Sequence, residues 1–157
     1  MEMKASTLIG QPILRAEDPR LITGSGTFID DMKRPGMLHA VILRSNVAHG
    51  RIRAIDASAA LGIEGVHTVI TAADIGDQVP VIPLRLANLP EFKKYLQPVI
   101  AKDKVRYVGE PIAVVIADTR AIAEDALESI EVDIETLPAV PDRHAAVGAG
   151  SLLFEKS

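Results

Sequence analysis

The sequence contains no cysteine, no tryptophan and only 3% aromatic residues among its 157. Without cysteine the chain can form no disulfide framework, supply no thiolate nucleophile and ligate no iron–sulfur cluster. With so few aromatic residues, the core must be built from Ala, Val, Ile and Leu, the usual filling of compact α/β layers. An excess of positive charge is also missing. The net charge of −4 therefore argues against nucleic acid as a partner.

Long hydrophobic runs are absent as well. The longest apolar stretch, residues 112–117, is far too short to cross a bilayer, and the first residues lack the apolar run of a secretory signal. We therefore expect no membrane insertion and a cytoplasmic location. The length and the balance of 48% hydrophobic to 24% charged residues are those of one ordinary globular domain.

Short strand and helix signals alternate along the chain. Helices are predicted over residues 57–61, capped by Asp56, and from the cap at Asp118 or Thr119 to about Ser129. The pattern favours an α+β fold, with one mixed β-sheet and two or three helices in a single domain. Strands are predicted over residues 21–30, 37–43 (apolar enough to be covered on both faces), 50–55, 66–71, 105–108, 112–117 and 131–135.

Proline positions suggest the domain boundaries. Pro12 and Pro19 make residues 1–20 an N-terminal arm, residues 21–141 form the domain, and residues 142–157 are a linker or tail. Residues 76–98 form a long excursion that holds four prolines and shows no clear period. Loops of this length in compact domains tend to be functional or disordered.

The residues by themselves point to no catalytic, cofactor-binding or metal site. His39, His49, His67 and His144 lack metal-ligand spacing, so each is expected to be structural or superficial. The glycines at 24 and 26 are not followed by a helix that could receive a phosphate. A small independent enzyme would have to use Glu110 or a histidine as its acid or base, without geometric support.

Several collinear blocks nevertheless resemble one family. They are residues 9–12, 15–18, 21–24, 27–31, 35–40, 44–45, 48–52, 55–56, 65–66, 69–75, 105–113 and 137–140. Together they resemble the α/β-hammerhead domain of the large subunit of molybdenum hydroxylases, the family of xanthine dehydrogenase, aldehyde oxidase and carbon monoxide dehydrogenase. Asn46 and Gly50 depart from the pattern, in a turn where we expect either residue to be accommodated.

The resemblance implies a structural and interface domain without an active site of its own, so that the isolated chain is inactive. In this family the hammerhead domain precedes a larger region that binds molybdopterin, and iron–sulfur and flavin (FAD) subunits complete the oxidoreductase. That enzyme hydroxylates or oxidises a small carbonyl compound or heterocycle with water. None of the family's cofactor motifs occurs in this sequence. The chain is then either a truncated product or one piece of a split subunit, and the alternative is a free-standing interaction module with the hammerhead fold.

Two groups of residues are structural or interface candidates. Gly109 is expected to need a positive φ where Glu110 and Pro111 redirect the chain into a buried strand. The excursion is expected to contact the molybdopterin-binding domain, or a second copy in a homodimer, and to be poorly ordered alone; otherwise its side chains cover the domain's own core. Its apolar residues are Val79, Val81, Ile82, Leu84, Leu86, Leu89, Phe92, Tyr95 and Leu96.

Overall fold

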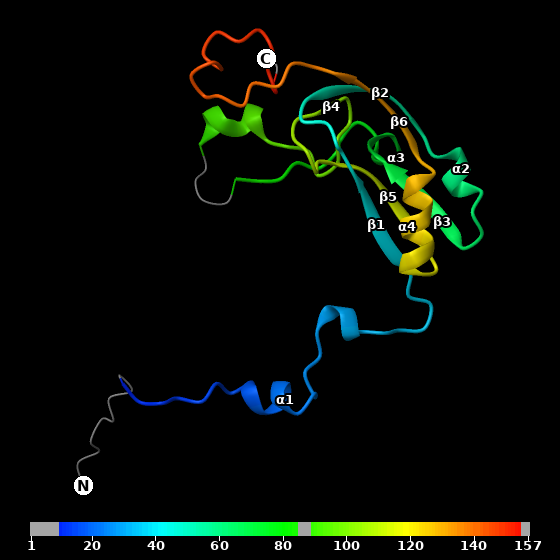
Figure 1. The fold of residues 1–157 in the computed structure, drawn as a ribbon, viewed down its shortest axis with the longest axis vertical. Helices are drawn as coiled ribbons and strands as arrows, with labels where there is room; N and C mark the ends of the chain where they lie inside the picture. Colours follow the sequence, from blue (N-terminus) through cyan, green and yellow to red (C-terminus); the bar gives the residue numbers. More distant parts are fainter. Residues whose placement is uncertain (1–9, 85–88, 155–157) are drawn as a thin grey trace. The chain divides into compact units, whose positions relative to one another are not determined.

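The computed structural model describes residues 10–84 and 89–154 (Figure 1). Contacts divide the chain into two units, residues 1–37 and 38–157. Predictions that concern residues 1–9 of the arm, Leu86 of the excursion and residues 155–157 of the tail lie outside the described residues. The boundaries proposed at residues 20/21 and 141/142 stay predictions.

The first unit contains two short helical elements, α1 (Asp18–Ile22) and the 3-10 turn η1 (Ile29–Asp31). The strand predicted over residues 21–30 is therefore wrong. Pro19 lies in the first turn of α1, where its fixed φ favours a helix, and a short apolar run does not distinguish the two structures by itself. Pro35 and Gly36 form a turn, with the Met37 N–H bonded to the Arg34 carbonyl and φ 72° at Gly36.

The second unit is built on two three-stranded sheets, with strand orders β1-β5-β3 and β4-β2-β6. Every strand pairing in them is antiparallel, so the α+β class is confirmed and the mixed sheet is wrong. The elements are β1 (His39–Arg44), β2 (Gly50–Asp56), α2 (Ser58–Leu61), β3 (Val66–Thr71), α3 (Ala72–Ile75), η2 (Pro90–Tyr95), β4 (Lys104–Val105), β5 (Pro111–Ala117), α4 (Arg120–Glu128) and β6 (Glu131–Thr136).

Strand β5 lies in the middle of its sheet and is the most buried of the strands longer than two residues, as its apolar sequence predicts. Ala113, Val115 and Ala117 are fully buried in the main core. Strand β1 forms one edge of the same sheet and alternates between half-buried and exposed residues. The prediction that β1 is covered on both faces is therefore wrong, because its apolar run includes an exposed Ile42.

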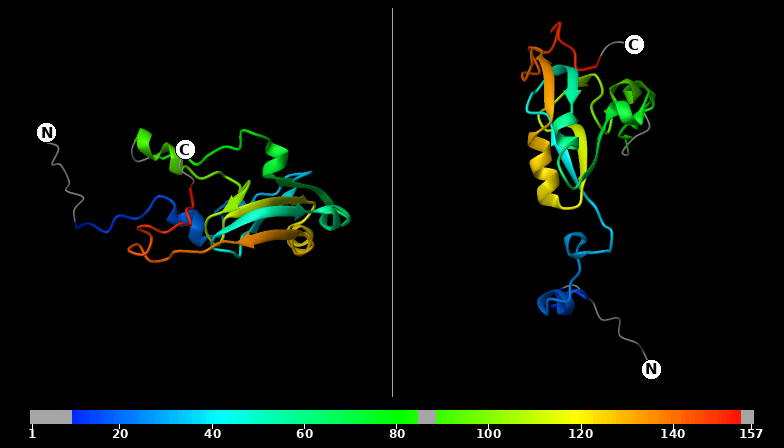
Figure 2. Two further views of the ribbon diagram at one scale, coloured as in Figure 1. Left: turned by 90° about the horizontal axis from the view of Figure 1, so that it is seen from above. Right: turned by 90° about the vertical axis from the view of Figure 1, so that its right-hand side faces the viewer.

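Helix α4 packs on β1 and β5, as Figures 1 and 2 show. It begins as predicted, since the Thr119 side chain accepts a hydrogen bond from the Ile122 N–H. Ala123 and Ala126 are completely buried against the sheet. Small side chains on the buried face of α4 and on β5 let the helix lie close to the sheet. Close packing of this kind explains how a chain with so few aromatic residues fills its core.

Strand β2 is the middle strand of the second sheet and pairs with β4 and β6. Gly50 starts this strand and is buried, and a Cβ there would press on the Cγ2 atom of Ile134 and lie 3.1 Å from the Glu135 carbonyl oxygen. The expectation that Gly50 lies in a turn, where a change between Ala and Gly is easily accommodated, is thus wrong, because Gly50 begins a strand and an added Cβ has no room. Asn46, in contrast, is exposed in the bend before β2.

The excursion is a loop whose two limbs are joined by backbone contacts near its ends. Val81 and Pro98 form an isolated antiparallel bridge, the Ile82 N–H donates to the Gln97 carbonyl at 2.8 Å, and the Val99 N–H donates to the Pro80 carbonyl at 2.9 Å. The loop also includes η2, in which no residue is buried. In the described part of the chain, no helix has the length and apolar character needed to cross a membrane.

Candidate functional site

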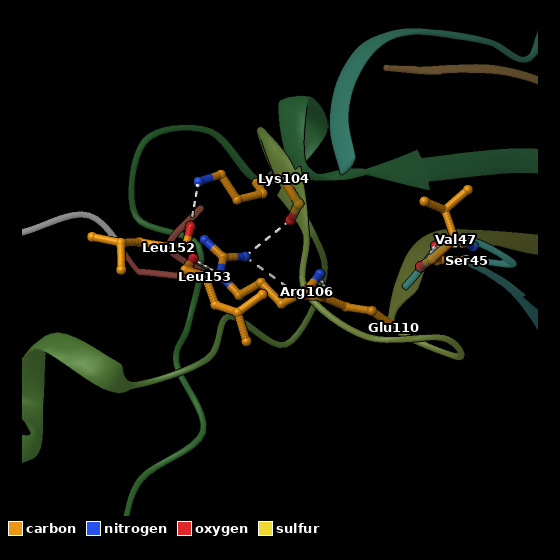
Figure 3. Close-up of polar contacts among 7 residues, drawn as sticks. All are labelled: Ser45, Val47, Lys104, Arg106, Glu110, Leu152 and Leu153. Carbon is orange, nitrogen blue, oxygen red and sulfur yellow. Dashed lines mark hydrogen bonds and ion pairs between the residues drawn. The ribbon is translucent and has the colours of Figure 1, made fainter. Parts of the chain in front are cut away.

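Two cationic side chains, Lys104 in the edge strand β4 and Arg106 directly after it, contact the backbone of residues 152 and 153. Lys104 and Arg106 alternate with Val105, which is fully buried in the second core. Lys104 Nζ donates to the carbonyl oxygen of Leu152 at 3.2 Å, and Arg106 Nε donates to that of Leu153 at 3.2 Å (Figure 3). Residues 151–154, which we name the C-terminal segment, are thereby attached to the sheet by their backbone.

Glu110 supports Arg106 from the interior. Its side chain is fully buried, and its carboxylate accepts a hydrogen bond from the Arg106 backbone N–H while Oε1 lies 3.5 Å from the guanidinium. Its own carbonyl accepts from the Ser45 N–H at 2.9 Å. A buried carboxylate is tolerated only when it is paired and hydrogen-bonded, and here both of its oxygens are engaged. The arrangement suits a structural role better than that of a general base.

Gly109 has the positive φ that its sequence context predicts, at 94°. Its N–H donates to the Ser45 carbonyl at 2.7 Å, and its carbonyl accepts from the Arg44 guanidinium at 2.9 Å. Pro111 then begins β5 opposite Arg44. The turn at residues 109–111 therefore joins the end of β1 to the start of β5.

Aromatic contacts connect the excursion to the C-terminal segment. The rings of Phe92 and Tyr95 are 6.1 Å apart, and Tyr95 meets Phe154 edge-on at 5.8 Å. The Arg106 guanidinium lies 5.1 Å from the centre of the Phe154 ring. Two candidate residues, Glu110 and Tyr95, are thus linked through Arg106 and Phe154, although they come from different segments.

The candidate apolar residues of the excursion keep much of their surface exposed. Phe92 is 44% exposed and Tyr95 48% exposed, while Leu84 is 52% exposed on the other limb of the loop. Figures 1 and 2 show η2 beside the C-terminal segment. The predicted contact of this loop with a partner, and its disorder in the isolated chain, stay predictions.

His49 fixes the other end of the C-terminal segment. It is 3% exposed, and its Nδ1 lies 2.9 Å from the Pro138 carbonyl oxygen and 3.2 Å from Ser151 Oγ. A carbonyl only accepts, so Nδ1 carries the proton. Nε2 is buried without a partner among the described residues. Together with Ser151 and Leu152, His49 lines a mostly apolar pocket of about 450 Å³.

The remaining histidines are separated from one another. His39 lies on β1, His67 on β3 is 2.7 Å from Asp118, and His144 lies in an exposed turn after β6. Within residues 10–84 and 89–154, no three His, Asp or Glu side chains gather as metal ligands. Glu110, Lys104, Arg106 and His49 instead hold backbone groups in place.

Two carboxylates outside this site have a pKa below the usual value. Hydrogen bonds from the Ser58 side chain and backbone lower the pKa of Asp56 before α2. Hydrogen bonds from the Thr71 backbone and hydroxyl lower the pKa of Asp74 in α3. Both are exposed residues at helix starts, where an ionised carboxylate is favoured by the local N–H groups.

Sequence reasoning missed three residues of the site, Lys104, Arg106 and Phe154, and named His49 only as one of four structural or superficial histidines. A signal was present for the first two, because the alternation of Lys104, Val105 and Arg106 predicts two cations on one face of a strand. No local pattern indicates that a phenylalanine 48 positions beyond Arg106 would pack on its guanidinium.

Comparison with known proteins shows a clear relationship. Residues 23–138 match the family model described as the aldehyde oxidase and xanthine dehydrogenase a/b hammerhead domain. The chain is 44% identical over 126 residues to the carbon monoxide dehydrogenase large chain of Hydrogenophaga pseudoflava, covering 80% of this chain and 15% of that one. It is 41% identical over 143 residues to the nicotine 6-hydroxylase large subunit of Paenarthrobacter nicotinovorans, covering 91% and 17%.

The fold is similar as well. A Cu,Mo-CO dehydrogenase in its carbon monoxide reduced state superposes with a TM-score of 0.77 at 38% identity, over 87% of this chain and 16% of that chain. The chain thus spans less than a fifth of the length of these curated relatives.

Proposed function

The chain belongs to the aldehyde oxidase and xanthine dehydrogenase a/b hammerhead family, and from this premise we propose that it is a structural and interface domain of a molybdenum-dependent oxidoreductase. The complete enzyme is proposed to hydroxylate or oxidise a small carbonyl compound or heterocycle with water. Support comes from relatives named carbon monoxide dehydrogenase, nicotine 6-hydroxylase and aldehyde oxidoreductase. The proposed location is the cytoplasm.

The observation that carries this proposal is that four charged or polar side chains of the site hold backbone groups in place. Glu110 holds the Arg106 N–H, Arg106 and Lys104 hold carbonyls of the C-terminal segment, and His49 holds the Pro138 carbonyl. A domain organised in this way fixes the path of the chain rather than reacting with a substrate.

The cofactors of the complete enzyme are proposed to be molybdopterin, iron–sulfur clusters and FAD, bound outside this chain. The residues present do not fit these groups. There is no cysteine to ligate a cluster, and the glycines at 24 and 26 precede no helix that could receive a phosphate. The proposed partners are the molybdopterin-binding large-subunit domain and the iron–sulfur and flavin subunits.

The excursion is the proposed contact surface for the molybdopterin-binding domain. Val81, Ile82, Leu84, Phe92 and Tyr95 are each between 44% and 52% exposed. Apolar side chains of this size gathered on one loop are typical of a surface that a partner covers. The prolines of the loop limit its conformational freedom and so reduce the entropy lost on docking.

Cofactor analysis of co-expressed proteins tests the proposal. The tagged chain is purified alone and after co-expression with the remainder of the large subunit, and molybdenum, iron and flavin are quantified. We expect molybdenum only in the co-purified complex. Phe92→Ser should lower the yield of the co-purified complex. Leu61→Ser, which changes a similarly exposed apolar residue of α2, should leave that yield unchanged. Stoichiometric molybdenum on the chain alone would overturn the proposal, and a chain that never associates would favour the free-standing module.

A further inference from the structure

The 3-10 turn η2 is weakly held by its own structure. It has six residues, and none of them is buried. Backbone hydrogen bonds join Phe92 to Leu89 at 3.0 Å and Leu96 to Lys93 at 3.3 Å. A 3-10 turn of this length is uncommon, because its hydrogen bonds are poorly aligned. Contacts with the rest of the domain are therefore needed to hold η2 in position.

Open space lies between η2 and the second sheet. A hollow of about 610 Å³ is lined by Lys94 of η2 and by Arg51 of β2. Leu153 and Phe154 also line this hollow. The C-terminal segment thus lies where η2 is separated from the sheet.

The ring of Phe154 bridges this space. Tyr95 of η2 meets it edge-on, with ring centres 5.8 Å apart and ring planes at 84°. The Arg106 guanidinium lies 5.1 Å from the centre of the same ring. Both contacts are attractive, because the face of an aromatic ring is negative and its edge is positive. One side chain therefore joins the excursion to the residue that follows β4.

Arg106 is the fixed end of this contact. Its Nη1 donates to the Lys104 carbonyl at 2.9 Å, its Nε donates to the Leu153 carbonyl at 3.2 Å (Figure 3), and the buried Glu110 pairs with it. A guanidinium held in this way loses little further freedom when Phe154 packs on it. The core thus sets the position of Phe154, and Phe154 sets that of Tyr95.

We infer that the C-terminal segment is a strap that positions the excursion, with Phe154 seated on Arg106 and holding η2 through Tyr95. When the strap leaves Arg106, η2 loses this support, while each sheet keeps its own core. Phe92 and Tyr95, whose rings are 6.1 Å apart, belong to the proposed contact surface. The effect of the strap on docking rests on the proposed function, whereas its effect on η2 in the isolated chain does not.

Trypsin cleavage of the full 157-residue chain tests the inference without a partner. Cleavage after Lys93 and Lys94 follows the population of the open loop when opening and closing are fast. Phe154→Leu keeps an apolar side chain and removes the ring. It should raise the cleavage rate at both lysines about threefold to tenfold, the factor expected for the loss of an aromatic pair.

Ring-proton NMR gives a second reading of the same contact. The chain has only two tyrosines, Tyr95 and Tyr107, so their signals are readily distinguished. Phe154→Leu should shift the ring signals of Tyr95, because an adjacent aromatic ring is lost. Phe154→Tyr keeps the ring and should retain the parent cleavage rate.

Two further variants separate the strap from a general loosening of the chain. Leu152→Ala is the matched control, because Leu152 is 43% exposed in the same segment and contacts Lys104 through its carbonyl, which the substitution keeps. It should change the rate less than twofold. Arg106→Lys keeps the charge but loses the planar guanidinium, and should raise the rate. In the Phe154→Leu background it should have no further effect, because Arg106 acts through Phe154.

Cleavage after Arg53 within β2 reports on global unfolding and should not change. If Phe154→Leu accelerates it, Arg106→Lys decides the test. Unchanged cleavage at Lys93 and Lys94 together with unchanged Tyr95 signals would overturn the inference. An effect of Leu152→Ala as large as that of Phe154→Leu would do so as well. Association with the remainder of the large subunit is measured separately, so failure of the proposed function leaves this result standing.

Discussion

Glu110 and Arg106 form a pair in which the acid is fully buried and the base reaches the surface. The Glu110 carboxylate accepts from the Arg106 backbone N–H and lies 3.5 Å from its guanidinium. The guanidinium in turn holds the Leu153 carbonyl and the Phe154 ring. This pair therefore connects the core to the C-terminal segment.

Removal of the Glu110 carboxylate should destabilise the domain. Glu110→Ala leaves a buried N–H without its acceptor and Arg106 without its partner, and should lower the free energy of unfolding by about 3 kcal/mol. Glu110→Gln, which can still accept from the N–H, should cost less. Urea unfolding followed by far-ultraviolet circular dichroism measures both, because the chain has no tryptophan to report by fluorescence.

Glu128→Gln on the exposed face of α4 is the control for this series and should change stability by less than about 0.5 kcal/mol. An unchanged unfolding midpoint in Glu110→Ala would show that the buried pair contributes nothing.

Substitution of Gly109 tests the backbone of the same turn. Its φ is 94°, in the region that side-chain-bearing residues rarely adopt, and an added Cβ there would meet no atom within 4 Å, so the Cβ itself causes no clash. Gly109→Val should cost about 1–2 kcal/mol. Gly150, which also has open space around it but no positive φ, is the matched position, and Gly150→Val should be neutral in the same thermal melts. Equal melting midpoints for the two variants would contradict the argument.

The carboxyl of Asp74 should titrate below its usual pKa because of Thr71. The backbone N–H and the hydroxyl of Thr71 donate to Oδ2 at 2.7 and 2.8 Å, which lowers the pKa of Asp74 from 3.8. Since the folded pKa lies below the unfolded one, this interaction stabilises the domain above the unfolded pKa and is lost as pH falls through the folded pKa. Thr71→Val removes the hydroxyl and should raise the pKa of Asp74 toward 3.8.

Carboxyl-carbon NMR titration measures this change. Asp56 is an internal reference, because Ser58 and not Thr71 lowers its pKa. If Asp74 titrates identically in the parent chain and in Thr71→Val, the hydroxyl plays no part.

Limited proteolysis tests the excursion as a contact surface. Trypsin should cut rapidly at Lys93 and Lys94, which are exposed in η2, when the chain is alone. Addition of the remainder of the large subunit should slow this cleavage several-fold, because the partner covers the loop. Arg53, which is fixed within strand β2, should resist in both conditions and serves as the reference. Arg85 is a further expected site but lies outside the described residues. Equal cleavage rates at Lys93 and Lys94 would refute the contact.

Sequence reasoning succeeded where a local pattern and a local structure coincide. The buried strand β5, the Thr119 cap of α4 and the positive φ of Gly109 each follow from a few neighbouring residues. The strand predicted over residues 21–30 was wrong because it also relied on a local pattern. An apolar run does not show whether another strand is available to pair with it.

The site itself depends on contacts between distant segments. Glu110 was a candidate because of the turn in which it lies, but its role is to hold Arg106. Arg106 in turn contacts the Leu153 carbonyl and the Phe154 ring, which are far away in the sequence. Gly50 shows the same limit. Its close approach to Ile134 results from the pairing of β2 with β6, which no residue near position 50 indicates.

We propose that this chain acts by association with the molybdopterin-binding remainder of the large subunit. Sedimentation of the two purified pieces, mixed at about 10 μM each, tests it directly, since an interface with a Kd of about 1 μM would be mostly occupied at that concentration. We predict one species with the mass of a 1:1 complex, and two separate species when the chain carries Phe92→Ser together with Tyr95→Ser. Independent sedimentation of the two unmodified pieces would show that this chain does not act by such an association.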